Sequence, residues 1–185
     1  MSLIGHIETA EPIALDPNRN DAAGLALSVF LPVLGLVCVQ AIGGAAGVYA
    51  GGYPTLPFAL PTSVANLLPI LMFPLWGIAR WAAFQNGARG RAASWWVVGL
   101  MGVMLAYPYV TLGLDGFLTN WLDLGVLILA VAATVRVATV SRSGLLCMMP
   151  PLLILGAAAI PGYVVVTGGW SPGLAITVGL VHPER

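Results

Sequence analysis

Side chains that could carry chemistry are scarce in the apolar stretches of this sequence. Asp123 is the one acid within an apolar run long enough to span a membrane, and an acid at such a position is a functional candidate by default. Tyr107 and Tyr109 flank Pro108 in an earlier run, where a phenol suits the rim of a ligand pocket because its ring is apolar and its hydroxyl needs a partner. No pair of nucleophile and base, phosphate-binding loop or dinucleotide fingerprint accompanies them. The sequence therefore favours binding over catalysis.

Asp123 also has an interpretation that involves no ligand. Asn120 lies three residues earlier and suits the cap of a helix, which would place Asp123 in the first helical turn. A negative charge there is favoured by the helix dipole. We expect capping at the membrane edge, with a polar contact to a ligand or a loop as the alternative.

The cysteines and histidines do not predict a metal or redox site. Cys38 and Cys147 each lie inside an apolar run, so they form neither a disulfide framework nor a zinc spacing. His6 and His182 lie in two polar tails, which removes the usual axial ligand for a haem iron within the membrane. We expect no obligatory cofactor and no metal, and a tetrapyrrole bound in the apolar part would be metal-free or held without histidine.

The composition places these residues in a membrane protein. Of 185 residues, 59% are hydrophobic and 8% are charged, whereas a soluble domain is about half apolar and about a quarter charged. Seven arginines balance seven acids, and no lysine is present. A basic patch that could neutralise phosphates is therefore missing, and we expect the lipid bilayer, and no nucleic acid, as a partner.

Five apolar runs match the roughly 20 residues that a helix needs to cross a bilayer core of about 30 Å. We expect an all-α integral membrane protein, with a five-transmembrane-helix bundle over residues 22–167 and spans at about 22–48, 63–84, 92–112, 121–140 and 145–166. Residues 1–21 and 168–185 read as polar or interfacial tails. Residues 51–61 contain three prolines and two glycines, which predicts a structured loop instead of a helix.

The arginines orient this predicted bundle. Cytoplasmic segments retain Lys and Arg, and five spans place six of the seven arginines in or next to segments on the side of the N-terminus: Arg19, Arg80, Arg89, Arg91, Arg136 and Arg142. Only Arg185 falls on the opposite side. We predict a cytoplasmic N-terminus and a C-terminus on the opposite side.

Prolines occur inside four of the five predicted spans: Pro32, Pro69, Pro74, Pro108, Pro150, Pro151 and Pro161. Each proline removes a backbone donor and frees a carbonyl, which neighbours or water must satisfy in lipid. Membrane helices either tolerate these prolines without consequence or are kinked by them so that a cavity opens. Their presence in four spans favours proline-kinked helices.

Small residues recur along the third apolar run at Gly99, Gly102 and Ala106. The four-residue spacing from Gly102 to Ala106 lets two helices approach closely. This spacing suits either packing within the chain or a homodimer interface.

Six sequence elements together resemble a known family. They are the glycines Gly43, Gly44 and Gly47, the loop from Tyr53 to Pro61, the stretch from Phe73 to Ala79, the stretch from Tyr107 to Gly113, Asp123 ten residues further on, and the stretch from Met149 to Leu152. In this order they are similar to the TspO/MBR family, the translocator proteins or tryptophan-rich sensory proteins. The resemblance covers about residues 22–166, and the chain departs from it where the family's ligand-site tryptophans are replaced by Pro69 and Ile154.

The resemblance implies a protein that binds an apolar or tetrapyrrole ligand of porphyrin, sterol or isoprenoid type in its helix bundle, for sensing, transport or regulation. By position, it assigns ligand contacts to Tyr53, Phe73, Tyr107, Pro108, Asp123 and Ala158, under a lid formed by residues 51–61. Tyr107 and Phe73 would stack on the ligand, and Asp123 would supply a polar contact. Porphyrin breakdown enters by this resemblance alone and would need light or oxygen. The alternative is a structural or accessory subunit of a larger membrane complex without a pocket.

Overall fold

The computed structural model describes residues 20–46 and 62–166, and these residues form five helices and no strand. The helices are α1 (Asn20–Ala45), α2 (Thr62–Phe84), α3 (Gly87–Val110), α4 (Gly116–Ala138) and α5 (Arg142–Val166). All five are long and apolar enough to cross a membrane. The prediction of an all-α chain with five membrane-length helices is confirmed for this part of the sequence.

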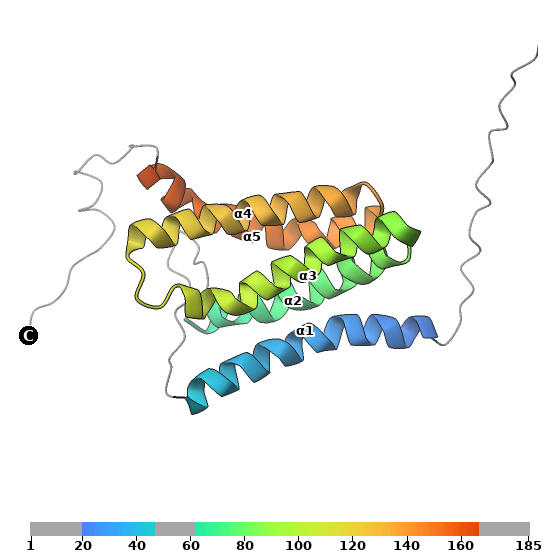
Figure 1. Ribbon diagram of the computed structural model, residues 1–185, viewed down its shortest axis with the longest axis horizontal. Helices are drawn as coiled ribbons and strands as arrows, with labels where there is room; N and C mark the ends of the chain where they lie inside the picture. Colours follow the sequence, from blue (N-terminus) through green and yellow to red (C-terminus); the bar gives the residue numbers. More distant parts are fainter. Residues whose placement is uncertain (1–19, 47–61, 167–185) are drawn as a thin grey trace, which may run out of the picture.

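Figure 1 shows the five helices side by side, with α1 at one edge of the bundle. α2 packs against α1, α3 and α5, and α4 packs against α3 and α5, whereas α1 has its main contact with α2. The two largest fully buried side chains are Trp76 and Phe73 of α2. α2 is therefore the central helix, and the core lies between it and helices α3, α4 and α5.

α1 is held close to α2 by a glycine. A methyl group at Gly77 would overlap the backbone carbonyl of Ser28, so only glycine lets the two backbones approach this closely. One turn further along α2, the Arg80 guanidinium donates a hydrogen bond to the Ser28 hydroxyl over 3.1 Å. Backbone contact and side-chain hydrogen bond thus meet at one residue of α1.

α3 and α4 each begin five residues before the predicted apolar run, at Gly87 instead of 92 and at Gly116 instead of 121. Polar residues such as Arg89 and Arg91 interrupt the hydropathy pattern, but their exposed side chains leave the helical backbone intact. The helical backbone also continues through the internal prolines, which include Pro32, Pro69, Pro74 and Pro108. Kinks at these prolines stay a prediction.

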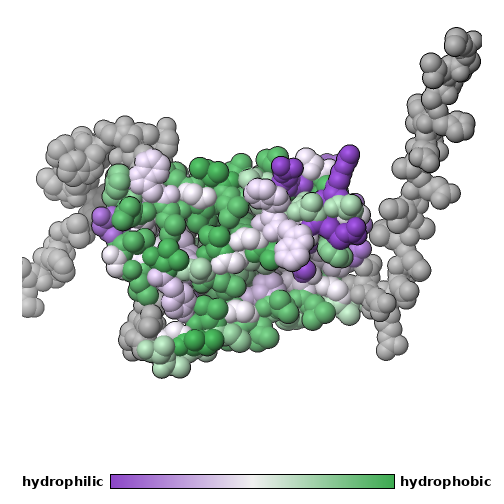
Figure 2. Space-filling view, viewed as in Figure 1, coloured by the Kyte–Doolittle hydropathy of each residue, from purple (hydrophilic) through white to green (hydrophobic). Residues whose placement is uncertain are grey.

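Polar and apolar side chains are separated along the bundle. Figure 2 shows hydrophilic residues gathered at one end of a surface that is otherwise mainly hydrophobic. This is the end at which α2 and α4 finish and α3 and α5 begin, and it holds all five arginines of the described residues: Arg80, Arg89, Arg91, Arg136 and Arg142. Asp115 and Asp123, at or near the start of α4, lie towards the other end.

Candidate functional site

Asp123 forms the central polar contact of the candidate site. The Tyr107 hydroxyl on α3 donates a hydrogen bond to the Asp123 carboxylate on α4. Tyr107 is only 3% exposed, whereas Asp123 is half-buried. The pair places a charged acceptor at the edge of an apolar core and leaves part of Asp123 accessible.

The expected capping role of Asn120 and Asp123 is wrong. The N-cap of α4 is Asp115, whose backbone is extended and whose side chain accepts a hydrogen bond from the Leu118 amide over 2.8 Å. The helix therefore begins at Gly116, and Asp123 lies about two turns inside it. Gly113, with a φ of 77°, turns the chain into this cap. The sequence pattern misplaced the cap because Asn120 offers the same capping chemistry as Asp115 five residues later.

The other predicted ligand contacts lie mostly in the core. Phe73 is 0% exposed and packs edge-on against Trp76, with ring centroids 5.4 Å apart. Phe73 and Tyr107 belong to one continuous hydrophobic cluster. Pro108 and Ala158 are buried as well. Tyr53 and the predicted lid lie outside the described residues.

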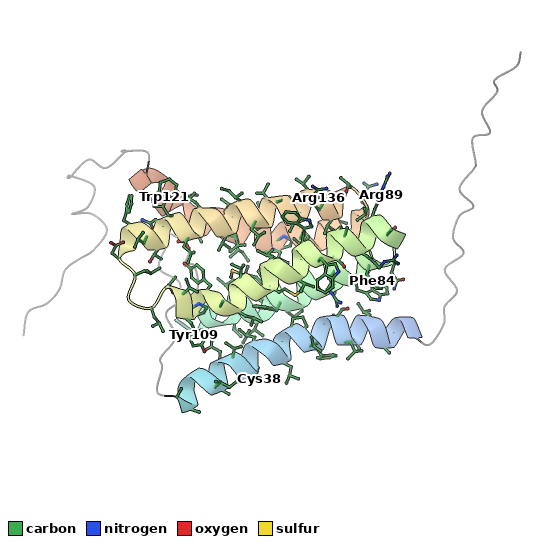
Figure 3. The ribbon with its side chains drawn as sticks, viewed as in Figure 1. Cys38, Phe84, Arg89, Tyr109, Trp121 and Arg136 are labelled. Carbon is green, nitrogen blue, oxygen red and sulfur yellow. The ribbon has the colours of Figure 1, made fainter. Side chains whose placement is uncertain are left out.

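Tyr109 forms a second contact at the same end of the bundle. Its hydroxyl donates a hydrogen bond to the backbone carbonyl of Val39 over 2.6 Å and so joins α3 to α1. A methyl group at Gly43 would overlap this hydroxyl, so glycine makes room for it. Figure 3 shows Tyr109 at the junction of α3 and α1.

An apolar groove of about 230 Å³ lies beside this contact. It runs between the last turns of α1 and the end of α3, and its lining residues are Val39, Ile42, Gly43, Ala46 and Tyr109. Tyr109 and Gly43 were both singled out by the sequence, but their contact was not predicted. The hydroxyl of Tyr109 bonds to a backbone carbonyl, which every residue carries, so the sequence does not indicate the partner. The groove is suited to hydrocarbon, since nearly all of its surface is apolar.

The described residues offer binding surfaces and few reactive groups. No group of three or more His, Cys, Asp or Glu comes together among them in a way that could hold a metal ion. Cys38 is exposed on α1, and Cys147 lies half-buried on α5. The chemistry of the site is therefore that of a hydroxyl, a carboxylate and aromatic rings.

The small residues of α3 point away from the core. Gly99, Gly102 and Ala106 are exposed, and a methyl group added at either glycine would meet nothing within 4 Å. Of the two roles that the spacing allows, packing within the described part of the chain is thus not the one that they fulfil.

Comparisons with protein-family models, with curated proteins and with solved structures find no match for this chain.

Proposed function

We propose that this chain is a TspO-like integral membrane protein that binds an apolar or tetrapyrrole ligand in its helix bundle, for sensing, transport or regulation. The ligand is of porphyrin, sterol or isoprenoid type. The bundle has its N-terminus in the cytoplasm and its C-terminus on the opposite side. Five helices of membrane-spanning length and composition support the location.

The hydrogen bond between Tyr107 and Asp123 is the observation that carries the proposal. A carboxylate within an apolar helix is costly unless it is paired or used, and Tyr107 occupies only part of its hydrogen-bonding capacity. The exposed part of Asp123 can accept a polar group of a ligand whose apolar body lies against neighbouring hydrophobic side chains. Such a combination of one polar contact with apolar surroundings is typical of pockets for small molecules, where a few polar groups orient an apolar ligand.

Several features at the same end of the bundle support this location. The helices alternate in direction, so the end of α1, the end of α3 and the start of α4 lie together, as Figure 1 shows. The apolar groove beside Tyr109 lies at this end as well, on the side of α3 that faces α1 and not on the side of Asp123. A ligand at this position would lie far from the arginines at the other end.

Titration of the purified full chain with protoporphyrin IX, followed by quenching of tryptophan fluorescence, tests the proposal. We expect saturable quenching in the wild type and binding weakened by about tenfold in Tyr107→Phe, because the Tyr107 hydroxyl holds in position the Asp123 carboxylate that accepts from the ligand. Tyr109→Phe is the matched control, since it removes a hydroxyl that bonds to Val39 and not to Asp123. Quenching that does not saturate would contradict the proposal for a porphyrin, as would equal effects of the two variants.

A second candidate function is a structural or accessory subunit of a larger membrane complex. The outward-facing Gly99 and Gly102 favour it, because small exposed residues let a partner helix approach closely. This function predicts co-purification with a stoichiometric partner from mild detergent. Mass spectrometry of the same extract separates the two candidates, because a bound small molecule would support the ligand site instead.

A further inference from the structure

One face of the bundle combines arginines with an exposed tryptophan at the end opposite Asp123. The Arg136 guanidinium on α4 lies over the Trp96 ring on α3, with 5.8 Å between the guanidinium carbon and the ring centroid. Trp96 is 41% exposed, and Arg136 is exposed as well. The ring therefore holds a cation in place at the surface while leaving its donors accessible.

Arg89 belongs to the same face. It precedes Trp96 by seven residues, which is close to two helical turns and brings both side chains to one side of α3. Figure 3 shows Arg89 and Arg136 at the same end of the bundle, on α3 and α4. Neither arginine forms an ion pair with an acid of the described residues. Their positive charge is thus left uncompensated within that part of the chain.

The apolar residues below these arginines continue the face along the bundle. Val103 follows Trp96 by seven residues on α3 and is 39% exposed. On α4, Ala132 and Gly125 precede Arg136 by four and eleven residues and so lie on its side of the helix. Gly125 is exposed, and a methyl group there would meet nothing within 4 Å. Gly125 has no side chain and Ala132 a small one, so this side of α4 leaves room for a hydrocarbon chain.

We propose that this α3–α4 face, formed by Arg89, Trp96 and Val103 of α3 and by Gly125, Ala132 and Arg136 of α4, binds one anionic phospholipid of the surrounding bilayer. The phosphate lies between Arg89 and Arg136, and an acyl chain follows the small residues of α4. Arginine suits this role because its planar donors match phosphate oxygens in pairs. The site rests on the proposed insertion into a membrane, but not on the proposed ligand at Asp123.

The cytoplasmic retention of arginines predicts positive charge at this end without any lipid site. The two explanations differ in what a single arginine contributes. Arg91 lies two residues after Arg89, about 200° around α3, and is also exposed. If only the general positive charge at this end attracts lipid, replacing Arg91 and replacing Arg89 should lower lipid binding equally. If the lipid occupies the α3–α4 face, its binding should depend on Arg89 and not on Arg91.

Native mass spectrometry of the full chain with an equimolar mixture of phosphatidylglycerol and phosphatidylcholine tests the site. We expect the wild type to retain phosphatidylglycerol preferentially and Arg89→Gln or Arg136→Gln to retain about fivefold less, the effect of one basic side chain at an anionic membrane surface. Trp96→Leu should also lower retention, because it removes the ring that holds Arg136. Arg91→Gln, the matched control, should behave like the wild type.

Three results would overturn the lipid site: equal retention of the two lipids, a loss in Arg91→Gln as large as that in Arg89→Gln, or displacement of the lipid by an equal concentration of inorganic phosphate. Reconstitution into lipid nanodiscs separates this failure from a failure of the proposed function. A chain that does not enter nanodiscs contradicts membrane insertion itself. A chain that enters them without preferring phosphatidylglycerol contradicts only the lipid site.

Discussion

Tyr107 and Tyr109 are two residues apart on α3, yet they bind to different helices: Tyr107 donates to the Asp123 carboxylate on α4, and Tyr109 donates to the Val39 carbonyl on α1. Two residues turn a helix by about 200°, so the two rings point to opposite sides of α3. Pro108 lies between them and is fully buried. This short segment therefore links three helices at one end of the bundle.

The Tyr107–Asp123 hydrogen bond should contribute measurably to stability. We expect Tyr107→Phe to lower the free energy of unfolding by about 0.5–1.5 kcal/mol, the range for polar contacts between membrane helices. Asp123→Asn should cost less, because its amide oxygen still accepts from Tyr107. Denaturant titration in detergent, followed by circular dichroism, measures both values. A larger cost for Asp123→Asn than for Tyr107→Phe would show that the charge of Asp123 has a partner other than Tyr107.

The Gly43 position should tolerate a methyl group only when the Tyr109 hydroxyl is absent. We expect Gly43→Ala to lower the free energy of unfolding by about 1–3 kcal/mol, because the added methyl overlaps Tyr109. Adding Tyr109→Phe should restore part of this loss, since the hydroxyl is the atom that the methyl meets first. Gly44→Ala is the control, because a methyl there meets nothing within 4 Å. Additive losses in the double variant would contradict this contact.

Hydropathy was sufficient to predict the five membrane-length helices of the described residues and their approximate limits, because an apolar stretch of 18 or more residues forms a strong pattern. It could not locate the starts of α3 and α4, where polar residues lie at or before the first turn. The first two turns of α3 carry Arg89 and Arg91, and α4 is capped by Asp115. A cap depends on local backbone angles and on one hydrogen bond, and Asn120 offers the same side-chain chemistry as Asp115 at the wrong position.

The candidate site was predictable as a set of residues but not as a set of contacts. Composition singled out Asp123, since it is the one acid in a predicted span. Its partner Tyr107 lies 16 residues away on another helix, and the helix packing that joins them has no local signature. Gly77 shows the same limit, because the need for glycine there arises from the backbone of Ser28 on a different helix.

The α1–α2 crossing should fail if Gly77 gains a side chain. We expect Gly77→Ala to lower the free energy of unfolding by about 1–3 kcal/mol, since the methyl would overlap backbone, which cannot rotate away. Gly24→Ala at the same interface is the control, because its nearest neighbour would be the Trp81 side chain at an ordinary 3.6 Å. Thermal unfolding in detergent compares the two variants. Equal melting temperatures would contradict the close approach of the two helices.

The orientation of the bundle can be measured by cysteine labelling. In a variant that lacks Cys38 and Cys147, we expect Asn86→Cys, between α2 and α3, to react with an impermeant maleimide only from the cytoplasmic side. Leu114→Cys, between α3 and α4, should react only from the opposite side, because α3 runs from one end of the bundle to the other. Arginines near Asn86 favour this orientation. The reverse labelling pattern would contradict a cytoplasmic N-terminus.

We expect a homodimer to form through Gly99, Gly102 and Ala106 of α3, as the alternative to a phospholipid on the neighbouring α3–α4 face. Gly99 and Gly102 lie on the exposed side of α3 without neighbours within 4 Å of an added methyl, so bulk added there leaves the fold of one chain intact. We expect the double variant Gly99→Leu/Gly102→Leu to be monomeric in lipid nanodiscs, with the helix content of the wild type, because leucines keep the two α3 helices apart. Ala138→Leu adds similar bulk at an exposed position of α4 and should leave the dimer unchanged. Single-molecule photobleaching counts the subunits, and a wild-type chain that bleaches in one step would contradict the dimer.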